Sequence, residues 1–206
     1  MSPAEQVLAA ITDLAKASDV ADQWDQAPAL YSVRRPGLAD EPVSLRGFAL
    51  PSQVWAGRPP EVLARLAHGF ETAPQPVREL IGKVTPCCLH GVVFQCETWT
   101  VTGEIDQDSP RARRIEAMAS RGLLHQHEDR IETRSLMAVD RHGGRYLVDT
   151  HRGRGLQASV HEPAAYGPHN LTGGIFESLH RIVAAFRRDH SDQCSTCPAE
   201  QRSDAT

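Results

Sequence analysis

The strongest constraint on the fold is a pair of alternating segments that face each other across a glycine turn. Residues 131–139 place Ile, Thr, Ser, Met and Val on one side of an extended chain, and residues 146–150 answer them after the turn sequence DRHGG at 140–144. Alternation with a period of two is typical of a half-buried strand, and glycine supplies the positive φ of a tight reversal. The sequence therefore predicts an antiparallel β-hairpin here.

Other segments carry the periods of helices and strands. Apolar residues at helical spacing predict a C-terminal helix over 175–186, and a serine, proline and glutamate at positions 2, 3 and 5 predict a capped N-terminal helix over 3–17. Proline-led starts predict helices over 59–70 and 109–120, the second of them on the surface, with a short turn over 77–81. Runs rich in β-branched and aromatic residues predict the remaining strands, over 29–33, 43–50 and 91–101.

This order of elements predicts an α+β protein with an antiparallel sheet of about five strands. N-terminal, middle and C-terminal helices are expected to pack on the sheet. We expect a single domain over residues 1–188 and a disordered polar tail over 189–206. The element order resembles roadblock-like, profilin-like and PAS-like scaffolds, and also small secretion-chaperone folds. That resemblance implies binding or regulation and identifies no ligand.

Two charged segments bear on the origin of the chain. Residues 128–132 (EDRIE) and 138–146 (AVDRHGGRY) are similar to segments of small uncharacterised proteins from actinobacteria and their phages and plasmids. The resemblance implies a bacterial or mobile-element source, and it brings no known activity with it.

A histidine-rich string gives the first candidate metal site. Residues 125–129 (HQHED) resemble the HxHxDH core of metallo-β-lactamase-type hydrolases, in which imidazoles and a carboxylate hold zinc. Arg130 stands where the last histidine would be, and it would put a permanent cation beside the metal. The candidate ligands are His125 and His127, but zinc needs four correctly placed donors, so we expect a polar connection before a strand instead.

The cysteines offer two further chemical possibilities. Cys194 and Cys197 have C-x-x-C spacing, which could form half of a zinc site, but they fall in the predicted tail. Cys88 with His90, and a distant His151 next to Asp149, would suit a thiol nucleophile if the fold brought them together. No positional motif supports either arrangement, so we expect no catalytic residue, no metal and no cofactor.

Local arginine clusters keep nucleic acid open as a partner. The formal net charge of −4 provides no general cationic field for a phosphate backbone. Guanidinium groups beside glycine-rich turns can still bind phosphate, although no dinucleotide-binding or Walker loop is present. One arginine cluster comprises Arg111, Arg113, Arg114 and Arg121. A second cluster offers possible contacts to an anion or a nucleic acid through Arg141, Arg145, Arg152 and Arg154.

The first functional hypothesis is a non-enzymatic cytoplasmic adaptor or regulatory protein. It would contact another protein, or a second copy of itself, through a sheet edge or a surface helix. A cytoplasmic location is expected because five cysteines make a poor disulfide framework, residues 1–10 lack the features of a secretory signal, and no apolar run suits a membrane. The alternatives are a nucleic-acid-associated factor of a phage or plasmid and, second, a zinc- or thiol-dependent enzyme.

Overall fold

The computed structural model describes residues 2–20, 24–34, 43–82, 89–101, 108–161 and 174–187. Its helices are α1 (Pro3–Val20), α2 (Pro59–Thr72), α3 (Gln75–Gly82), α4 (Pro110–Ser120) and α5 (Gly174–Arg187), with short 3₁₀ turns η1 (Ser52–Trp55) and η3 (Leu124–Gln126). Its strands are β1 (Ala29–Arg34), β2 (Ser44–Gly47), β3 (Leu89–Val101), β4 (Arg130–Asp140), β5 (Arg145–His151) and β6 (Gly155–His161).

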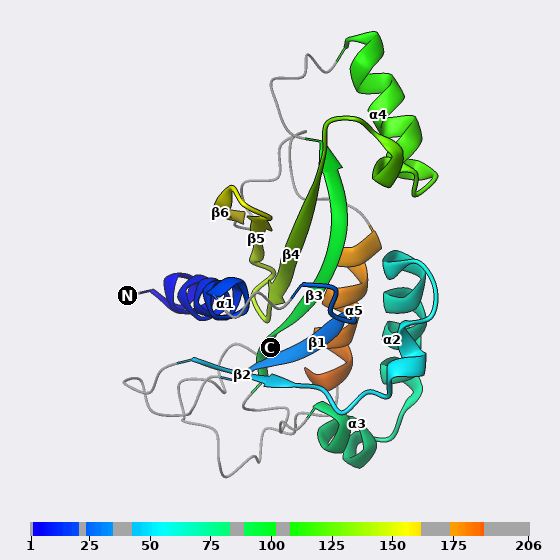
Figure 1. Cartoon of the computed structure of the whole chain (residues 1–206). Coiled ribbons are helices and arrows are strands. Elements are labelled where there is room, and N and C mark those ends of the chain that lie inside the picture. Colours follow the sequence, from blue (N-terminus) through cyan, green and yellow to red (C-terminus); the bar gives the residue numbers. More distant parts are fainter. Residues whose placement is uncertain are drawn as a thin grey trace.

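All six strands form one antiparallel sheet in the order β2-β1-β3-β4-β5-β6. The predicted α+β class, with N-terminal, middle and C-terminal helices on an antiparallel sheet, is confirmed (Figure 1). The predicted polar tail over 189–206 lies outside the described residues. Among the helices that the structure describes, none has the length and apolarity needed to cross a bilayer.

The sheet has one strand more than the sequence predicted. β6 pairs with β5 from His151 opposite Gly155 onward, and the turn between them is formed by residues 152–154. Gly153 and Gly155 have φ values of 73° and 91°, so both glycines adopt the left-handed backbone that a sharp reversal requires. The sequence predicted no strand after residues 146–150, whereas the glycine-rich segment reverses the chain into an edge strand.

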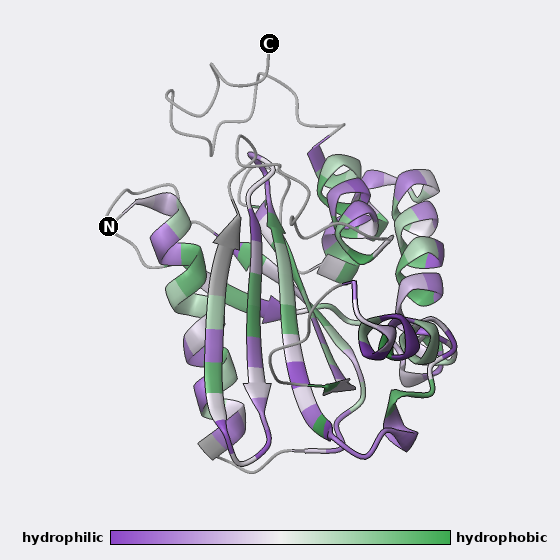
Figure 2. Cartoon of the chain, turned by 90° about the horizontal axis from the view of Figure 1, so that it is seen from above, coloured by the Kyte–Doolittle hydropathy of each residue, from purple (hydrophilic) through white to green (hydrophobic). Residues whose placement is uncertain are grey.

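Helices cover both faces of the sheet (Figure 2). One face packs against α1 through a core that includes Val7, Ile11, Leu136 and Tyr146. The other face packs against α5, and α2 packs in turn on α5, around a core of Phe94, Leu179, Phe186 and their neighbours. The hydrophobic residues of the strands therefore lie between two helical layers, and the outer surfaces of α2, α3 and α4 remain available.

The predicted hairpin is confirmed as β4 and β5, which pair from Val139 opposite Arg145. The carboxylate of Asp140 organises its turn: Oδ1 accepts hydrogen bonds from the backbone N–H of His142 and of Gly144, each at 2.8 Å. Oδ2 accepts a third hydrogen bond, at 2.5 Å, from the hydroxyl of Tyr146. A Cβ atom at Gly144 would lie 2.6 Å from that Oδ2, so the closeness of the carboxylate requires glycine there.

The capping box of the first helix is also present. The N–H of Ser2 donates to Glu5 at 2.5 Å, and the N–H of Glu5 donates to the hydroxyl of Ser2 at 3.2 Å. Hydrogen bonds from the backbone N–H and the side chain of Ser2 lower the pKa of the Glu5 carboxyl below its ordinary value. The helix continues to Val20, three residues beyond the predicted end.

Candidate functional site

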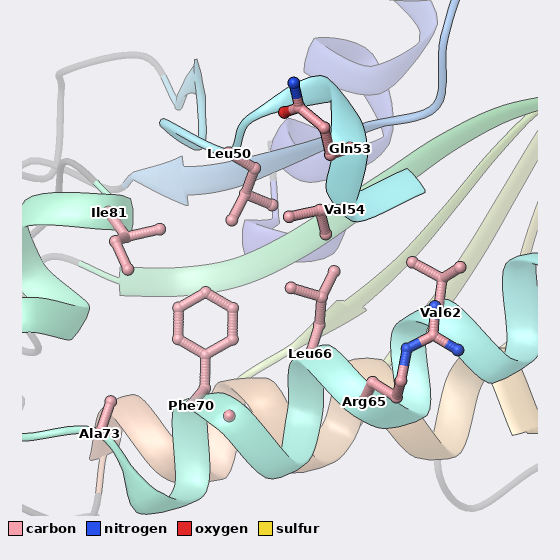
Figure 3. Close-up of a pocket in the computed structure, with 10 residues that line it drawn as sticks. Leu50, Gln53, Val54, Val62, Arg65, Leu66, Phe70, Ala73 and Ile81 are labelled. Carbon is pink, nitrogen blue, oxygen red and sulfur yellow. The ribbon is translucent and has the colours of Figure 1, made fainter. Parts of the chain in front are cut away.

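The candidate site is an apolar groove between η1, α2 and α3, with a volume of about 410 Å³ (Figure 3). Its volume falls in the range of roughly 300–1,000 Å³ that is usual for ligand sites. The side chains that give it its apolar character are Leu50, Val54, Val62, Leu66, Phe70 and Ile81.

The apolar residues of α2 serve two purposes: some pack in the core, and others line the groove. Leu63 is fully buried, whereas Leu66 is only partly buried and lines the groove. The ring of Phe70 lies 5.5 Å from the rings of both Phe48 and Phe186, so the floor of the groove rests directly on the core. The groove is therefore built on rigid packing.

Hydrogen bonds to backbone carbonyls hold the walls of the groove in place. The N–H of Ala49 donates to the carbonyl of Ile81 at 2.8 Å, which ties the segment before η1 to α3. The buried guanidinium of Arg78 donates to the carbonyls of Phe70 and Ala73 and so caps the C-terminal end of α2. Segment 77–81, predicted as a short turn, lies within an eight-residue helix fixed at both ends.

One side of the groove is open and carries a positive charge. Gly69 lines the groove, and a Cβ atom added to it would meet no other atom within 4 Å. Arg65 is the charged residue of the lining, and its Nη2 donates to the carbonyl of Ala56 at 3.0 Å. Because that partner is a neutral carbonyl, the guanidinium charge stays uncompensated by this contact.

Apolar surface continues from the groove along α3. Among the described residues, the exposed large apolar side chains are Val77, 42% exposed, and Leu80, 77% exposed. Val77 lies one helical turn before Ile81, which lines the groove, and Leu80 lies three residues after Val77. The sequence predicted only a short turn over 77–81, so the exposure of these two side chains comes from the structure.

The two candidate metal ligands of the histidine-rich string, His125 and His127, have other hydrogen-bond partners. His125 is exposed and its Nδ1 lies 3.1 Å from the carbonyl of Gly122, while the Nδ1 of buried His127 accepts a hydrogen bond from the N–H of Asp129 at 3.1 Å. Neither histidine belongs to a group of three potential metal ligands within the described residues. Cys194 and Cys197 lie outside those residues.

Within the part of the chain that the structure describes, the acids that do meet are Asp25, Glu97 and Glu132. Arg134 binds Glu97 at 2.8 Å, and Arg152 binds Glu132 at 2.6 Å. These guanidinium groups already neutralise two of the three carboxylates, so the cluster is a network of ion pairs rather than a cation site.

The residues of the thiol hypothesis are not brought together. His90 lies beside the Gly91–Asp140 pair, whereas His151 is opposite Thr133, at the other end of the sheet. Cys88 lies outside the described residues. The described thiol, that of Cys96, has its pKa raised to about 12 by burial, with smaller contributions from nearby carboxylates. It therefore stays protonated and is a poor nucleophile.

A polar row lies near Cys96 without the geometry of a catalytic triad. The hydroxyl of Ser135 donates to Asp149 at 2.6 Å, while His151 Nδ1 lies 2.9 Å from the hydroxyl of Thr133. The serine thus contacts the carboxylate directly, and the imidazole contacts a different hydroxyl. Nucleophilic catalysis needs the base on the nucleophile and the acid behind the base.

The predicted arginine contacts do not form a single patch, which corrects the sequence-based grouping. Arg141 and Arg145 lie at the β4–β5 turn, and Arg152 and Arg154 lie at the opposite end of β5. Seven residues of strand at about 3.3 Å each separate the two pairs by roughly 20 Å. The extended strand keeps these four charges apart, whereas the glycines near them had suggested one site.

No protein-family model, no curated protein and no solved structure matches the chain. The resemblance of residues 128–132 and 138–146 to actinobacterial and phage proteins therefore stays a prediction.

Proposed function

We propose that the protein is a non-enzymatic adaptor or regulatory protein that binds a partner protein through the groove between η1, α2 and α3. The observation that carries this proposal is that α3, which contributes Ile81 to the apolar groove, also exposes the side chains of Val77 and Leu80. Contiguous exposed apolar surface is costly in water and commonly marks an interaction site.

The shape of this surface favours a protein over a small molecule. A small ligand would fill the groove but would leave Leu80, 77% exposed on α3, in contact with water. A protein segment can place an apolar anchor in the groove and cover the adjoining helix surface at the same time.

We infer that the occupant is an amphipathic helix with an acidic residue beside its apolar anchors. Grooves between helical elements commonly receive the apolar face of such a helix. Arg65 supplies the positive charge of the lining, and a carboxylate on the partner would complement it.

The chemistry of the lining supports binding rather than catalysis. Its polar side chains are Gln53 and Arg65, and neither forms a nucleophile–base pair there. Cys96 forms no disulfide bond, which fits a protein that acts in the reducing cytoplasm.

The test is a selection of random displayed peptides on the purified full-length chain, followed by affinity measurements on the enriched peptides. We expect enrichment of apolar residues at helical spacing next to an acid. Gly69→Met should weaken their binding at least about tenfold, because a side chain at this open position fills the groove. Methionine also favours the helix more than glycine does, so the variant should remain folded.

The matched control is Ala64→Met, which adds the same side chain to an exposed position of α2 that does not line the groove. It should leave peptide affinity unchanged. Equal binding to wild type and Gly69→Met, or the failure of any peptide to bind, would contradict the proposal. A wild-type dimer that Gly69→Met converts to monomer would show that the occupant is a second copy of this chain.

A further inference from the structure

The helix α4 carries a row of cations on its outer face. Ala112, Ile115 and Met118 are its partly buried residues, so the opposite side of the helix faces solvent. Arg113 and Arg121, two helical turns apart, lie on that side and are exposed. The helix has no fully buried residue and stands at the end of the sheet, beyond β3 and β4 (Figure 1).

Small and cationic side chains complete this face. Ala117 lies midway between Arg113 and Arg121, and Arg114 lies seven residues before Arg121 on the same side. At 1.5 Å per residue, the guanidinium groups follow the helix for about 12 Å. An alanine between them leaves room for a strand of anions to approach the backbone.

Acidic groups border this face: Glu116 lies three residues after Arg113, and Arg114 lines a hollow together with Glu128 and Asp129. Arg111, on another side of the helix, is paired with Asp129 at 2.6 Å. Within the described residues, Arg113, Arg114 and Arg121 have neither an ion pair nor a hydrogen bond from the side chain.

A fourth cation lies beside the C-terminal end of α4. The Nη2 of Arg58 donates to the carbonyl of Ser120 at 3.0 Å, and this neutral partner leaves the guanidinium charge in place. The residue is exposed, so it adds a cation beside the last residue of α4.

We infer that the outer face of α4, formed by Arg113, Ala117, Arg114 and Arg121, binds the phosphate backbone of duplex DNA. This activity goes beyond the proposed protein-binding groove and uses a different surface.

The composition of the face favours nucleic acid over an acidic protein. Protein interfaces obtain most of their affinity from buried apolar and aromatic anchors, and this face has no apolar side chain larger than alanine. Electrostatic contacts from cations supply essentially all of the affinity of non-specific DNA binding, and the major groove admits an α-helix. Because the whole chain carries a net charge of −4, we expect weak binding without sequence preference and with a strong dependence on salt.

The test is the fluorescence anisotropy of a short labelled DNA duplex, titrated with the full chain at several salt concentrations. The double variant Arg113→Gln with Arg121→Gln removes two phosphate contacts. It should weaken binding about tenfold at low salt and reduce the slope of log K against log salt by about 1.8. Glutamine is a good helix former, and circular dichroism will verify that α4 and the fold are retained.

The matched control is Lys16→Gln with Arg46→Gln, which changes the net charge equally at exposed positions on α1 and β2. It should leave affinity within about twofold, since these cations lie away from α4. No binding by wild type at low salt, or an equal loss in the control, would overturn the inference. Tighter binding of labelled polyglutamate than of the duplex, at the same charge concentration and salt, would overturn it in favour of an acidic protein partner.

Discussion

The antiparallel pair β3–β4 crosses two regions of the molecule that are held in different ways. In β3, residues 89–96 are all buried between the core on α1 and the core on α5. From Glu97 onward the same strand meets charged and polar groups. The guanidinium of Arg134, which is fully buried, donates to Glu97 and lies 4.6 Å from the ring centre of Trp24.

The opposite face of the sheet makes the same change from apolar to polar. Phe94 packs in the core on α5, but further along the ladder Thr100 lies 2.7 Å from Thr133, and Thr133 lies 2.9 Å from His151. Hydrogen bonds between side chains here replace the contacts between apolar side chains. The backbone pairing of β3 with β4 continues without a break through this change from apolar to polar side chains.

This difference separates two ways of stabilising one sheet. The apolar region depends on close packing, so its stability is sensitive to lost volume. The polar region depends on hydrogen bonds and ion pairs, so its stability is sensitive to any substitution that leaves a buried polar or charged group without its partner. The groove adjoins the apolar region, because Phe70 at its floor packs against Phe186 of the core. The helix α4, in contrast, follows the polar end of β3 in the chain.

Phe94→Ala should have the largest effect on stability. Phe94 is fully buried, and its ring lies 5.9 Å from that of Trp55. Deleting a buried phenyl ring removes its transfer free energy and leaves a cavity, so unfolding in urea should show a loss of about 3–5 kcal/mol. Val77→Ala, on the exposed surface of α3, is the control and should change the free energy of unfolding by less than about 0.5 kcal/mol.

Arg134→Met should test the polar region with a change that nearly conserves volume. Glu97, whose side chain is 12% exposed, would lose its cation and remain charged in a poorly solvated place. The expected loss of stability in urea unfolding is about 3 kcal/mol.

A second substitution separates this charge effect from packing. Glu97→Gln keeps an oxygen that can accept the N–H of Asp25, which Glu97 binds at 2.7 Å. The double variant with Arg134→Met should therefore be less destabilised than the sum of the two single variants, by about 1–3 kcal/mol. Additive effects would show that Arg134 acts as a packed side chain, and the contrast between the two regions would be lost.

The elements with strong local patterns were predictable from the sequence. The β4–β5 hairpin follows from alternation and a glycine turn, and the capping box of α1 follows from Ser2 and Glu5. β6 was missed because its start, Gly155, resembles a loop, although alternate apolar residues at 156, 158 and 160 were a usable signal.

The groove and the charged cluster depend on contacts between distant segments. One wall of the groove is fixed by the bond from Ala49 to Ile81, and no periodicity indicates that these residues meet. Likewise, Arg134 meets Trp24 and Glu97 only through the register of the sheet and the path of the chain after α1. The α4 arginines were noted in the sequence, but only the structure shows that Arg111 is paired while Arg113 and Arg114 form no ion pair within the described residues.

Asp149→Asn should give the smallest effect and should reveal the polar region through pH. Burial raises the pKa of the Asp149 carboxyl, although the hydrogen bond from Ser135 and the charge of His151 oppose the shift. The folded state then holds the proton more tightly than the unfolded state, so ionisation of this carboxyl lowers stability as pH rises.

Asparagine can still accept the Ser135 hydrogen bond without a charge, so the variant should be more stable at pH 7, by at most about 1 kcal/mol. Thermal unfolding across pH should show the two proteins converging below about pH 3.9, where the carboxyl is protonated even in the unfolded chain. If the variant instead loses stability at neutral pH, the Asp149 charge supports the fold, and the polar region is held by ion pairing on both faces of the sheet.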